Sequence, residues 1–464
     1  MQSVENKRKE LRFEIKGSVP DMESDGLKEI VYDYPWVTTI YFGGKESGFP
    51  HGQAIKARFF TKDPQSAPYI LQADTPCIFE LKIGPKDLTE SSRRRKYRIN
   101  TTLGEILPAL ERKENFDQLS TYQLRESKKP FPVSLLYAIS QHEKTDNFVP
   151  IAATHYHRRH FEDASLRATV DTNLQFFKFI KFYKDWFAFP ISQPEDGVIV
   201  EWKIPLDEEY VHNTSLDSFK SQNLLPSTSK FNKLKGVVEE SVLTVVNPEM
   251  RGSAEASDWN LMERELKIDL QADARNTLRR MVLDDAEYSL SQSYEETSYQ
   301  QFLIMGEGSI CLMGRGGRGQ FEVIKVKTSS HQEGDVLVRK EQIFKYSDEK
   351  LRQVFGAGDV EKQRYSAHFI RRRMQRNILC RNSGNIFNVF VDNCVAESPI
   401  ADLNQCEVEY HGRICAGEDN TFDLDQIDKD FKNLQRALVT YFTGREVPIQ
   451  SLGTTKYNWI RGLI

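Results

Sequence analysis

Short runs in which hydrophobic and polar residues alternate recur along most of this 464-residue chain, and they predict β-strands. Successive side chains of a strand point to opposite faces, so charges two residues apart share one face. In many runs lysine or arginine alternates with glutamate on such a face. One strand of this kind is typical of a sheet with a solvated face, but their repetition favours barrels with a wet, charged interior that suits an ionic ligand. The runs lie at residues 12–16, 37–42, 54–60, 78–83, 156–158, 166–171, 198–203, 263–267, 324–327, 336–341, 371–373, 390–392 and 407–409.

The runs fall into two series with similar openings and endings. Arg12-x-Glu14-x-Lys16 opens the first series and Glu263-x-Glu265-x-Lys267 opens the second. Ser-Thr-Ser-Lys230-Phe231 and Gly-Thr-Thr-Lys456-Tyr457 close them. Residues 251–258 are small and polar and lack a hydrophobic period, which favours a linker. We therefore expect an α+β chain with two tandem antiparallel β-barrel domains and accessory helices, at residues 1–236 and 259–464, joined by a linker at 237–258.

Composition limits the classes of protein and the compartment. Hydrophobic residues make up 39% of the chain and charged residues 28%, and the net charge of −4 argues against general affinity for nucleic acid. The sequence has no apolar run of membrane-spanning length and no cleavable signal peptide. Six cysteines without a CxxC pair favour free thiols over disulfides or a zinc site. These features predict a cytoplasmic protein.

The first series resembles, in order, the catalytic domain of the vacuolar transporter chaperone (VTC) family, which belongs to the CYTH or triphosphate tunnel superfamily. Two positions depart from the family pattern: Gly43 stands where an acid is usual, and Lys56 stands where arginine is more frequent. The segments that carry the resemblance are Arg12-x-Glu14-x-Lys16, Thr39-Ile-Tyr-Phe42, Ile55-Lys56-Ala-Arg58-Phe-Phe60, Phe79-Glu-Leu-Lys82, the basic cluster from Arg93, Tyr156-x-Arg158, Arg167-x-Thr169-x-Asp171, Glu201-x-Lys203 and Ser229-Lys230-Phe231.

The resemblance implies an eight-stranded antiparallel tunnel that makes inorganic polyphosphate from ATP, or binds it. Arginine and lysine bind phosphate oxygens, and a carboxylate can hold a metal ion that bridges to them. We therefore expect a polyphosphate polymerase that transfers the terminal phosphoryl group of ATP to a growing chain. A metal-dependent triphosphatase acting on tripolyphosphate or nucleoside triphosphates, and a non-catalytic module that binds polyphosphate or a 5′-triphosphate, remain alternatives. The implied residues are Lys56, Arg58, Arg158, Arg167 and Glu201 for catalysis, Arg12, Lys16, Lys82, Lys203 and Lys230 for phosphate binding, and Glu201 and Glu14 for Mg²⁺ or Mn²⁺.

The second series resembles a CYTH domain, because Glu263-x-Glu265-x-Lys267 has that superfamily's signature. Laid on the first series, Asp392 matches Asp171, Asn388 replaces Arg167, and Met313-Gly-Arg315 replaces the pair Lys56 and Arg58. The second domain is therefore expected to hold fewer phosphate-binding cations, as a diverged active site or as a regulatory or structural copy. Its candidate residues are Glu263, Glu265, Lys267, Arg315, Lys325, Lys327, Arg373 and Lys456.

Three further patterns have structural interpretations. Residues 314–319 fit GxGxxG, but strand-like segments on both sides favour a hairpin loop over a dinucleotide site. The histidines at 155, 157 and 160 divide between the two faces of a strand, which argues against a metal site. Residues 176–189 are aromatic, with Lys178, Lys181 and Lys184 three apart. We interpret them as a helix packed against the barrel, with peripheral membrane contact as a less favoured alternative.

Overall fold

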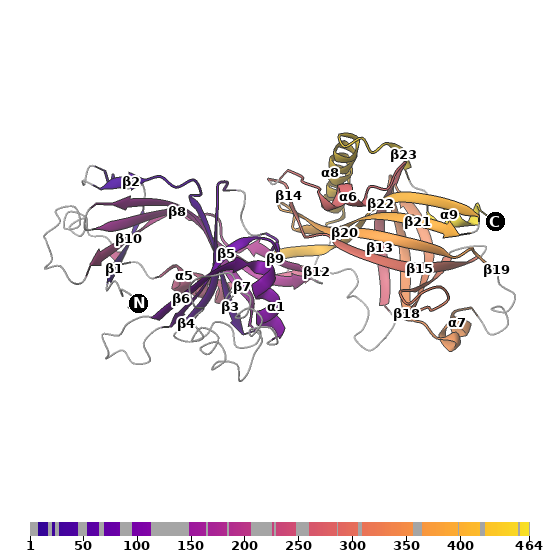
Figure 1. Ribbon diagram of the computed structural model, residues 1–464, viewed down its shortest axis with the longest axis horizontal. Coiled ribbons are helices and arrows are strands. Elements are labelled where there is room, and N and C mark those ends of the chain that lie inside the picture. The colour runs from indigo at the N-terminus through magenta and orange to yellow at the C-terminus, as the bar shows by residue number, and fades with distance from the viewer. Residues whose placement is uncertain are drawn as a thin grey trace. The chain divides into compact units, whose positions relative to one another are not determined.

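The chain forms two compact units, Met1–Val242 (unit 1) and Leu243–Ile464 (unit 2). Figure 1 labels many of the strands and helices of the two units. The computed structural model describes residues 8–16, 21–23, 27–44, 53–64, 69–83, 95–112, 148–163, 166–182, 185–205, 225–226, 229–246, 259–284, 286–304, 309–355, 364–397, 399–417, 423–452 and 455–463.

Unit 1 is built around one antiparallel sheet. Its strands pair in the order β11-β1-β10-β8-β7-β3-β4-β5-β6, with β2 on β7 and β9 on β8. Within the described residues β6 and β11 are the two ends of this order, so the sheet is open. The strands are β1 (Arg8–Lys16), β2 (Lys28–Ile30), β3 (Trp36–Gly44), β4 (Gln53–Thr61), β5 (Pro76–Ile83), β6 (Arg95–Thr102), β7 (Phe148–Glu162), β8 (Arg167–Phe182), β9 (Asp185–Pro190), β10 (Gly197–Pro205) and β11 (Leu225–Pro226).

The alternation of residues gives this sheet one hydrophobic and one charged face. On the hydrophobic face, Phe42 and Phe79 pack against α1 (Leu103–Arg112), and a second cluster surrounds Trp202. The charged face carries α5 (Lys230–Glu240), whose Leu234 and Val238 are buried against a local apolar cluster of this face. The burial of apolar side chains on one side leaves the alternating charges on the other.

Unit 2 contains a closed antiparallel barrel. Eight strands pair in the order β22-β21-β20-β15-β16-β17-β18-β13, and β13 also pairs with β22, which closes the sheet. The prediction of two closed barrels is thus met in one unit. The strands are β12 (Leu243–Val246), β13 (Trp259–Leu270), β14 (Tyr288–Leu290), β15 (Tyr294–Ile304), β16 (Ser309–Gly314), β17 (Val323–Glu333), β18 (Val336–Lys345), β19 (Arg364–Tyr365), β20 (Phe369–Cys380), β21 (Asn385–Glu397), β22 (Ile400–Ala416) and β23 (Ile449–Leu452), and the helices are α6 (Arg275–Arg279), α7 (Asp348–Phe355), α8 (Leu424–Thr443) and α9 (Lys456–Arg461).

The two units share the same order of strands. In unit 1 the order β1-β10-β8-β7-β3-β4-β5-β6 corresponds, strand by strand along the chain, to β13-β22-β21-β20-β15-β16-β17-β18 in unit 2. The difference is the closing pair, because β18 pairs with β13 in unit 2 and no pairing of β6 with β1 occurs among the described residues of unit 1. The internal repeat is therefore present in the topology.

The endings of the two series are equivalent. Ser229 caps the first turn of α5 and Thr455 caps that of α9, each by accepting a hydrogen bond from a backbone N–H. The aromatic residue that follows packs on the sheet in both units. Phe231 lies 5.2 Å from Tyr41, and Tyr457 lies 5.6 Å from Phe302, between ring centroids.

The openings are equivalent in a different register from the one predicted. Arg12 pairs with Glu201 on β10, and Lys267 pairs with Glu407 on β22. Glu10 on β1 therefore corresponds to Glu265, so the predicted match of Glu14 with Glu265 is wrong by four residues. A strand repeats every two residues, so the charge pattern alone cannot distinguish these registers.

Two predicted segments differ in the structure. Residues 176–182 and 185–189 belong to the paired strands β8 and β9, not to a helix, and Lys184 lies outside the described residues. Lysines three apart mimic a helical stripe, but in a strand they fall on opposite faces. Lys178 donates to the last carbonyls of α5 at Val238 and Ser241, whereas Lys181 lies over Trp186. The helix predicted there, on which the less favoured alternative of peripheral membrane contact rested, is therefore not formed.

The predicted linker 237–258 is partly regular structure. Helix α5 continues to Glu240, and β12 pairs with β22 at Val245 and Ile414. Residues 247–258 lie outside the described part of the chain. The predicted hairpin at the glycine-rich loop is found, because Met313 pairs with Val323 across it.

Two general features complete the fold. The six cysteines are free thiols, and all of them are buried. Among the described residues, no helix is both long enough and apolar enough to cross a membrane.

Candidate functional site

A continuous charged face crosses the strands of unit 1. Residues directly opposite each other in the antiparallel registers share a face, so each row of partners can be followed across the sheet. One row joins Tyr41, Lys56, Glu80 and Arg98 on β3 to β6. Further rows join Arg12 to Glu201, Lys203 to Arg167, and Asp171 to Arg158. The strand alternation therefore gathers most of the predicted site residues on one face.

Asp171 holds two of the predicted site cations, one assigned to catalysis and one to phosphate binding. Its carboxylate accepts from the Arg158 guanidinium at 2.6 and 2.8 Å and forms an ion pair with Lys230. Burial alone would raise the pKa of Asp171, but the charges of Arg158 and Lys230 outweigh it and hold that pKa below its ordinary value. Both cations contact this one carboxylate, so they connect β7, β8 and the start of α5.

Glu201 is surrounded by positive charge. Arg12 donates to Glu201 at 2.8 Å, and the Lys203 ammonium lies 3.3 Å from it. Burial would raise the pKa of Glu201, but the nearby cations, with Lys230 foremost, hold it far below its ordinary range. The predicted second ligand Glu14 forms an ion pair with Lys233 at 2.8 Å. Glu201 is thus an ionised carboxylate whose chemistry suits a divalent cation.

Arg58 differs from the other cations of this face. Lys56 and Arg98 both form ion pairs with the buried Glu80, at 2.8 and 2.6 Å. Arg58 donates instead to the Thr39 hydroxyl at 3.3 Å, and it forms no ion pair within the described residues. Its guanidinium is therefore available for an anion that enters from solution.

Three predicted residues lie away from this cluster or cannot be placed. Arg167 is 44% exposed and lies 3.5 Å from Glu162 at the end of its strand. Lys16 is exposed at the end of β1. The side chain of Lys82, like Arg93 and Arg94 of the basic cluster, lies outside the described residues.

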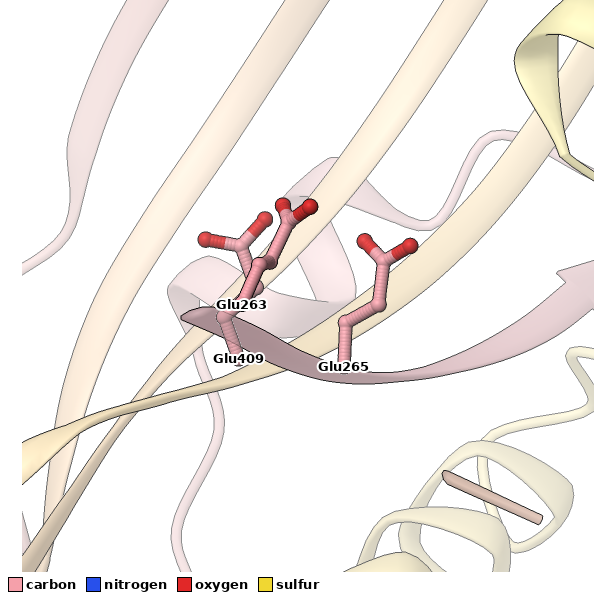
Figure 2. Close-up of side chains that lie close together, drawn as sticks. All are labelled: Glu263, Glu265 and Glu409. Carbon is pink, nitrogen blue, oxygen red and sulfur yellow. The ribbon is translucent and has the colours of Figure 1, made fainter. Parts of the chain in front are cut away.

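The barrel of unit 2 contains the one group of three acidic side chains close enough to share a metal ion among the described residues. Glu263 and Glu265 come from β13 and Glu409 from β22, with ligand oxygens within 4.8 Å of one another. Figure 2 shows the three carboxyl groups directed to the same side of their strands. Burial, and then the charge of Glu263, raises the pKa of Glu409 to about 8. Three crowded oxygen ligands fit a hard divalent cation such as Mg²⁺ or Mn²⁺, which would relieve this repulsion.

Cations surround this acidic group and the adjacent carboxylates of unit 2. Lys327 and Arg339 each donate to Glu263 at 2.8 Å, and Arg339 also pairs with Glu265. Arg373 donates to Asp392 and to Glu407 at 2.7 Å. Lys267 pairs with Glu407, Lys325 with Glu341, and Lys456 with both Asp392 and Glu407.

The pair Arg373 and Lys456 on Asp392 reproduces the pair Arg158 and Lys230 on Asp171. Burial alone would raise the pKa of Asp392, but Arg373 and Lys456 lower it to about 2. The same three charges therefore join two strands to the following helix in each unit.

Alignment of the two units on this shared cluster shows at which positions their charged residues differ. Counting along the registers, Lys203 stands where unit 2 has Glu409, and Arg8 stands where it has Glu263. The described residues of unit 1 therefore lack the acidic group of three. The sequence reasoning missed Glu409 and Arg339, although the alternation of Glu407 with Glu409 was visible.

The two cations of β4 in unit 1 have uncharged counterparts in unit 2. Cys311 and Met313 on β16 occupy the positions of Lys56 and Arg58. The prediction that Arg315 retains one of these charges is wrong, because Arg315 follows the end of β16 and is 68% exposed beside Glu296. The predicted replacement of Arg167 by Asn388 agrees with the registers.

Comparison with known families identifies the first unit. Residues 32–236 match the model of the VTC domain. Unit 1 contains a VTC domain. The match covers every strand from β3 to β10 and the start of α5, so the resemblance predicted from the sequence is confirmed for this unit. No curated protein matches the chain in sequence.

Solved structures show only a low likeness to the chain that contains this VTC domain. A Vibrio parahaemolyticus protein that carries the name of an adenylate cyclase shares 12% identity at a TM-score of 0.23, over 49% of this chain and 97% of its own. The structure of the S. pombe Pct1 RNA triphosphatase shares 11% sequence identity at a TM-score of 0.16, over 32% of this chain and 71% of its own. Its complex with the Spt5 CTD has the same identity and TM-score, over 32% of this chain and 70% of its own. These values are too low to assign a fold or a function.

Proposed function

We propose that unit 1 is a phosphotransferase that moves the terminal phosphoryl group of ATP to a growing inorganic polyphosphate chain. The observation that carries the proposal is the VTC domain match, whose residues include Lys56, Arg58 and Lys203 on the charged face of the sheet. A polyphosphate carries negative charge on every unit, so a row of cations across several strands suits it. The open edge of the described sheet suits a ligand of variable length.

The residues have distinct proposed roles. Arg58 binds a phosphate group through its uncommitted guanidinium, and Lys56, held by Glu80, contributes fixed positive charge beside it. Arg158 and Lys230 position this face through Asp171. Mg²⁺ or Mn²⁺ held at Glu201 would neutralise charge on the transferring group.

The proposed step is an exchange of two phosphorus–oxygen bonds. A terminal oxygen of the polyphosphate chain attacks the γ-phosphorus of ATP. The bond from that phosphorus to the β–γ bridging oxygen breaks, and ADP leaves with the electron pair. The cations of the face stabilise charge as it redistributes, which is most of what this chemistry requires.

A second candidate function is metal-dependent triphosphate hydrolysis in unit 2. The observation that favours it is the group Glu263, Glu265 and Glu409, whose crowding fits a divalent cation. Water would then replace the polyphosphate chain as the attacking group. The products separate the two candidates, because a polymerase yields ADP and a long chain and a hydrolase yields ADP and free phosphate.

The test is to incubate the full chain with ATP and Mn²⁺ and to follow both products, by gel electrophoresis for polyphosphate and by a colorimetric assay for orthophosphate. We expect long polyphosphate. Accumulation of orthophosphate alone would support the hydrolase, and the absence of both products with retained binding of tripolyphosphate would leave a binding module.

A pair of variants assigns the activity to a unit. Glu201→Gln should reduce polyphosphate synthesis by several powers of ten, on the order of 3–5 kcal/mol in the barrier, because it removes the carboxylate proposed to hold the metal. Glu265→Gln should reduce synthesis far less. The reverse pattern would place the chemistry in unit 2.

A further inference from the structure

One cation inside the barrel of unit 2 has no acidic partner within the part of the chain that the structure describes. Arg371 on β20 is only 9% exposed, and its Nε atom has no hydrogen-bond partner. Its Nη2 atom lies 3.5 Å from the sulfur of Met313. Among the described residues no carboxylate lies within ion-pair distance of Arg371. Asp392 interacts with Arg371 electrostatically at longer range, but it is already paired with Arg373 and Lys456.

This isolation sets Arg371 apart from its neighbours. Each of the other cations directed into the described barrel forms at least one ion pair with a buried carboxylate. They are Lys267, Lys325, Lys327, Arg339, Arg373 and Lys456. A buried charge without a partner destabilises a fold by several kcal/mol, so its presence requires a reason.

The internal repeat supplies the reason. Met313, which Arg371 contacts, occupies the position of Arg58 in unit 1, and Arg371 itself occupies the position of Tyr156. Each unit therefore places one unpaired guanidinium beside the same point of its sheet, from β4 in unit 1 and from β20 in unit 2. In unit 2 the positive charge that unit 1 carries on β4 therefore comes from β20.

A second polar group shares this face of the sheet on the neighbouring strand. Ser298 on β15 is directly opposite Arg371 in the register, and its side chain is fully buried. Its oxygen accepts a hydrogen bond from the Gln300 amide at 3.1 Å, which leaves the hydroxyl proton to donate. A guanidinium and a hydroxyl are both donors, so together they suit an oxyanion.

We propose that the barrel of unit 2 binds a single tetrahedral phosphate oxyanion at Arg371 and Ser298, independently of the site in unit 1. The ligand is either orthophosphate or the terminal group of a short polyphosphate, which present the same oxygens to the guanidinium fork. The inference stands whichever unit performs phosphoryl transfer, because it rests on groups that neither proposed reaction uses.

The test is isothermal titration calorimetry of the full chain with orthophosphate and, separately, with tripolyphosphate. Arg58→Ala is the background, so that the proposed site in unit 1 does not contribute. Loss of a charge-assisted hydrogen bond predicts that Arg371→Gln weakens binding roughly 10- to 100-fold. The neighbouring Arg372→Gln is the matched control, because Arg372 is exposed and belongs to the other face of β20.

Thermal unfolding without ligand separates a binding role from a structural one. Arg371→Gln removes an unpaired buried charge, so it should raise the melting temperature, whereas a structural arginine would lower it when removed. Arg371→Lys keeps the charge and should retain part of the affinity. Orthophosphate binding that depends on Arg371 identifies the free ion as ligand, and dependence with tripolyphosphate alone identifies the chain terminus. The proposal is overturned if Arg371→Gln leaves both ligands bound as before, or if it lowers the melting temperature without a change in affinity.

Discussion

At the scale of the residue, ion pairing divides the cations of each unit into two kinds. Arg158 and Lys230 share Asp171, and Arg373 and Lys456 share Asp392, so these four side chains join elements of the fold. Arg58 and Arg371 have no such partner among the described residues. Sequence alternation places both kinds on one face and cannot tell them apart, because pairing depends on which strand lies alongside.

This distinction predicts unequal effects within the set of cations inferred from the sequence. Arg58→Ala should lower polyphosphate synthesis by about 10²- to 10³-fold, because a preorganised donor to the phosphoryl group is lost, while the melting temperature changes little. Arg167→Ala is the control. Arg167 is half exposed beside Glu162, and its loss should change the rate by no more than a few fold. Steady-state kinetics of the two variants checks this prediction. An equal loss of rate in both variants would show that Arg167 belongs to the site.

At the scale of the element, the sequence predicted strands well and their registers poorly. Period-two alternation marks a strand by itself, which is why the runs at 37–42 and 407–409 lie in β3 and β22. A register also needs the partner strand, and a shift by two or four residues preserves every face. The match of Glu14 with Glu265 failed for that reason. The endings were matched correctly, since a capped helix with lysine and then an aromatic residue has no such ambiguity.

The cluster that joins β20, β21 and α9 predicts a dependence of stability on acid. Asp392 has a folded pKa of about 2 against an ordinary value of 3.8, so its contribution is complete above pH 4 and is lost as the pH falls toward 2. The loss should be on the order of 2 kcal/mol. Urea unfolding at a series of pH values from 5 to 2 measures it.

Asp392→Asn is the variant for this measurement. It should be less stable than the natural protein at pH 5 and should show a shallower decline toward pH 2, since the titrating group is gone. Asp171→Asn provides the matched change in unit 1. An Asp392→Asn variant whose decline is as steep as that of the natural protein would show that other carboxylates carry the acid sensitivity.

At the scale of the whole molecule, the two units share one order of strands but differ in closure and in charge. In unit 2 the closing pair places Glu263 opposite Arg339, an attraction across the seam. In unit 1 the corresponding strand has Arg8 in place of Glu263, and β6 is itself basic from Arg95 to Arg98. No opposite-charge pair corresponding to that of the seam is found among the described residues of unit 1. The repeat was readable from the sequence, whereas closure depends on contacts between the first and last strands of the order.

The difference in charge between the units predicts that a divalent cation stabilises unit 2 more than unit 1. Two compact units should give two transitions in differential scanning calorimetry of the full chain. Mn²⁺ should raise the transition of unit 2, because Glu263, Glu265 and Glu409 lie within 4.8 Å of one another and their repulsion is relieved on binding. The transition of unit 1, where Glu201 stands among cations, should rise much less without a phosphate ligand.

Glu409→Gln identifies the responding transition. It removes one ligand of the group of three, whereas Glu14→Gln removes a carboxylate of unit 1 that forms an ion pair with Lys233. The Mn²⁺ shift should disappear in Glu409→Gln and persist in Glu14→Gln. Because Glu409 has a pKa of about 8, Mn²⁺ competes with a proton below that pH, so the shift should be larger at pH 8.5 than at pH 6.5. A shift that survives Glu409→Gln, or one that follows the transition of unit 1, would place the metal at Glu201 and make the closed barrel a site for anions alone.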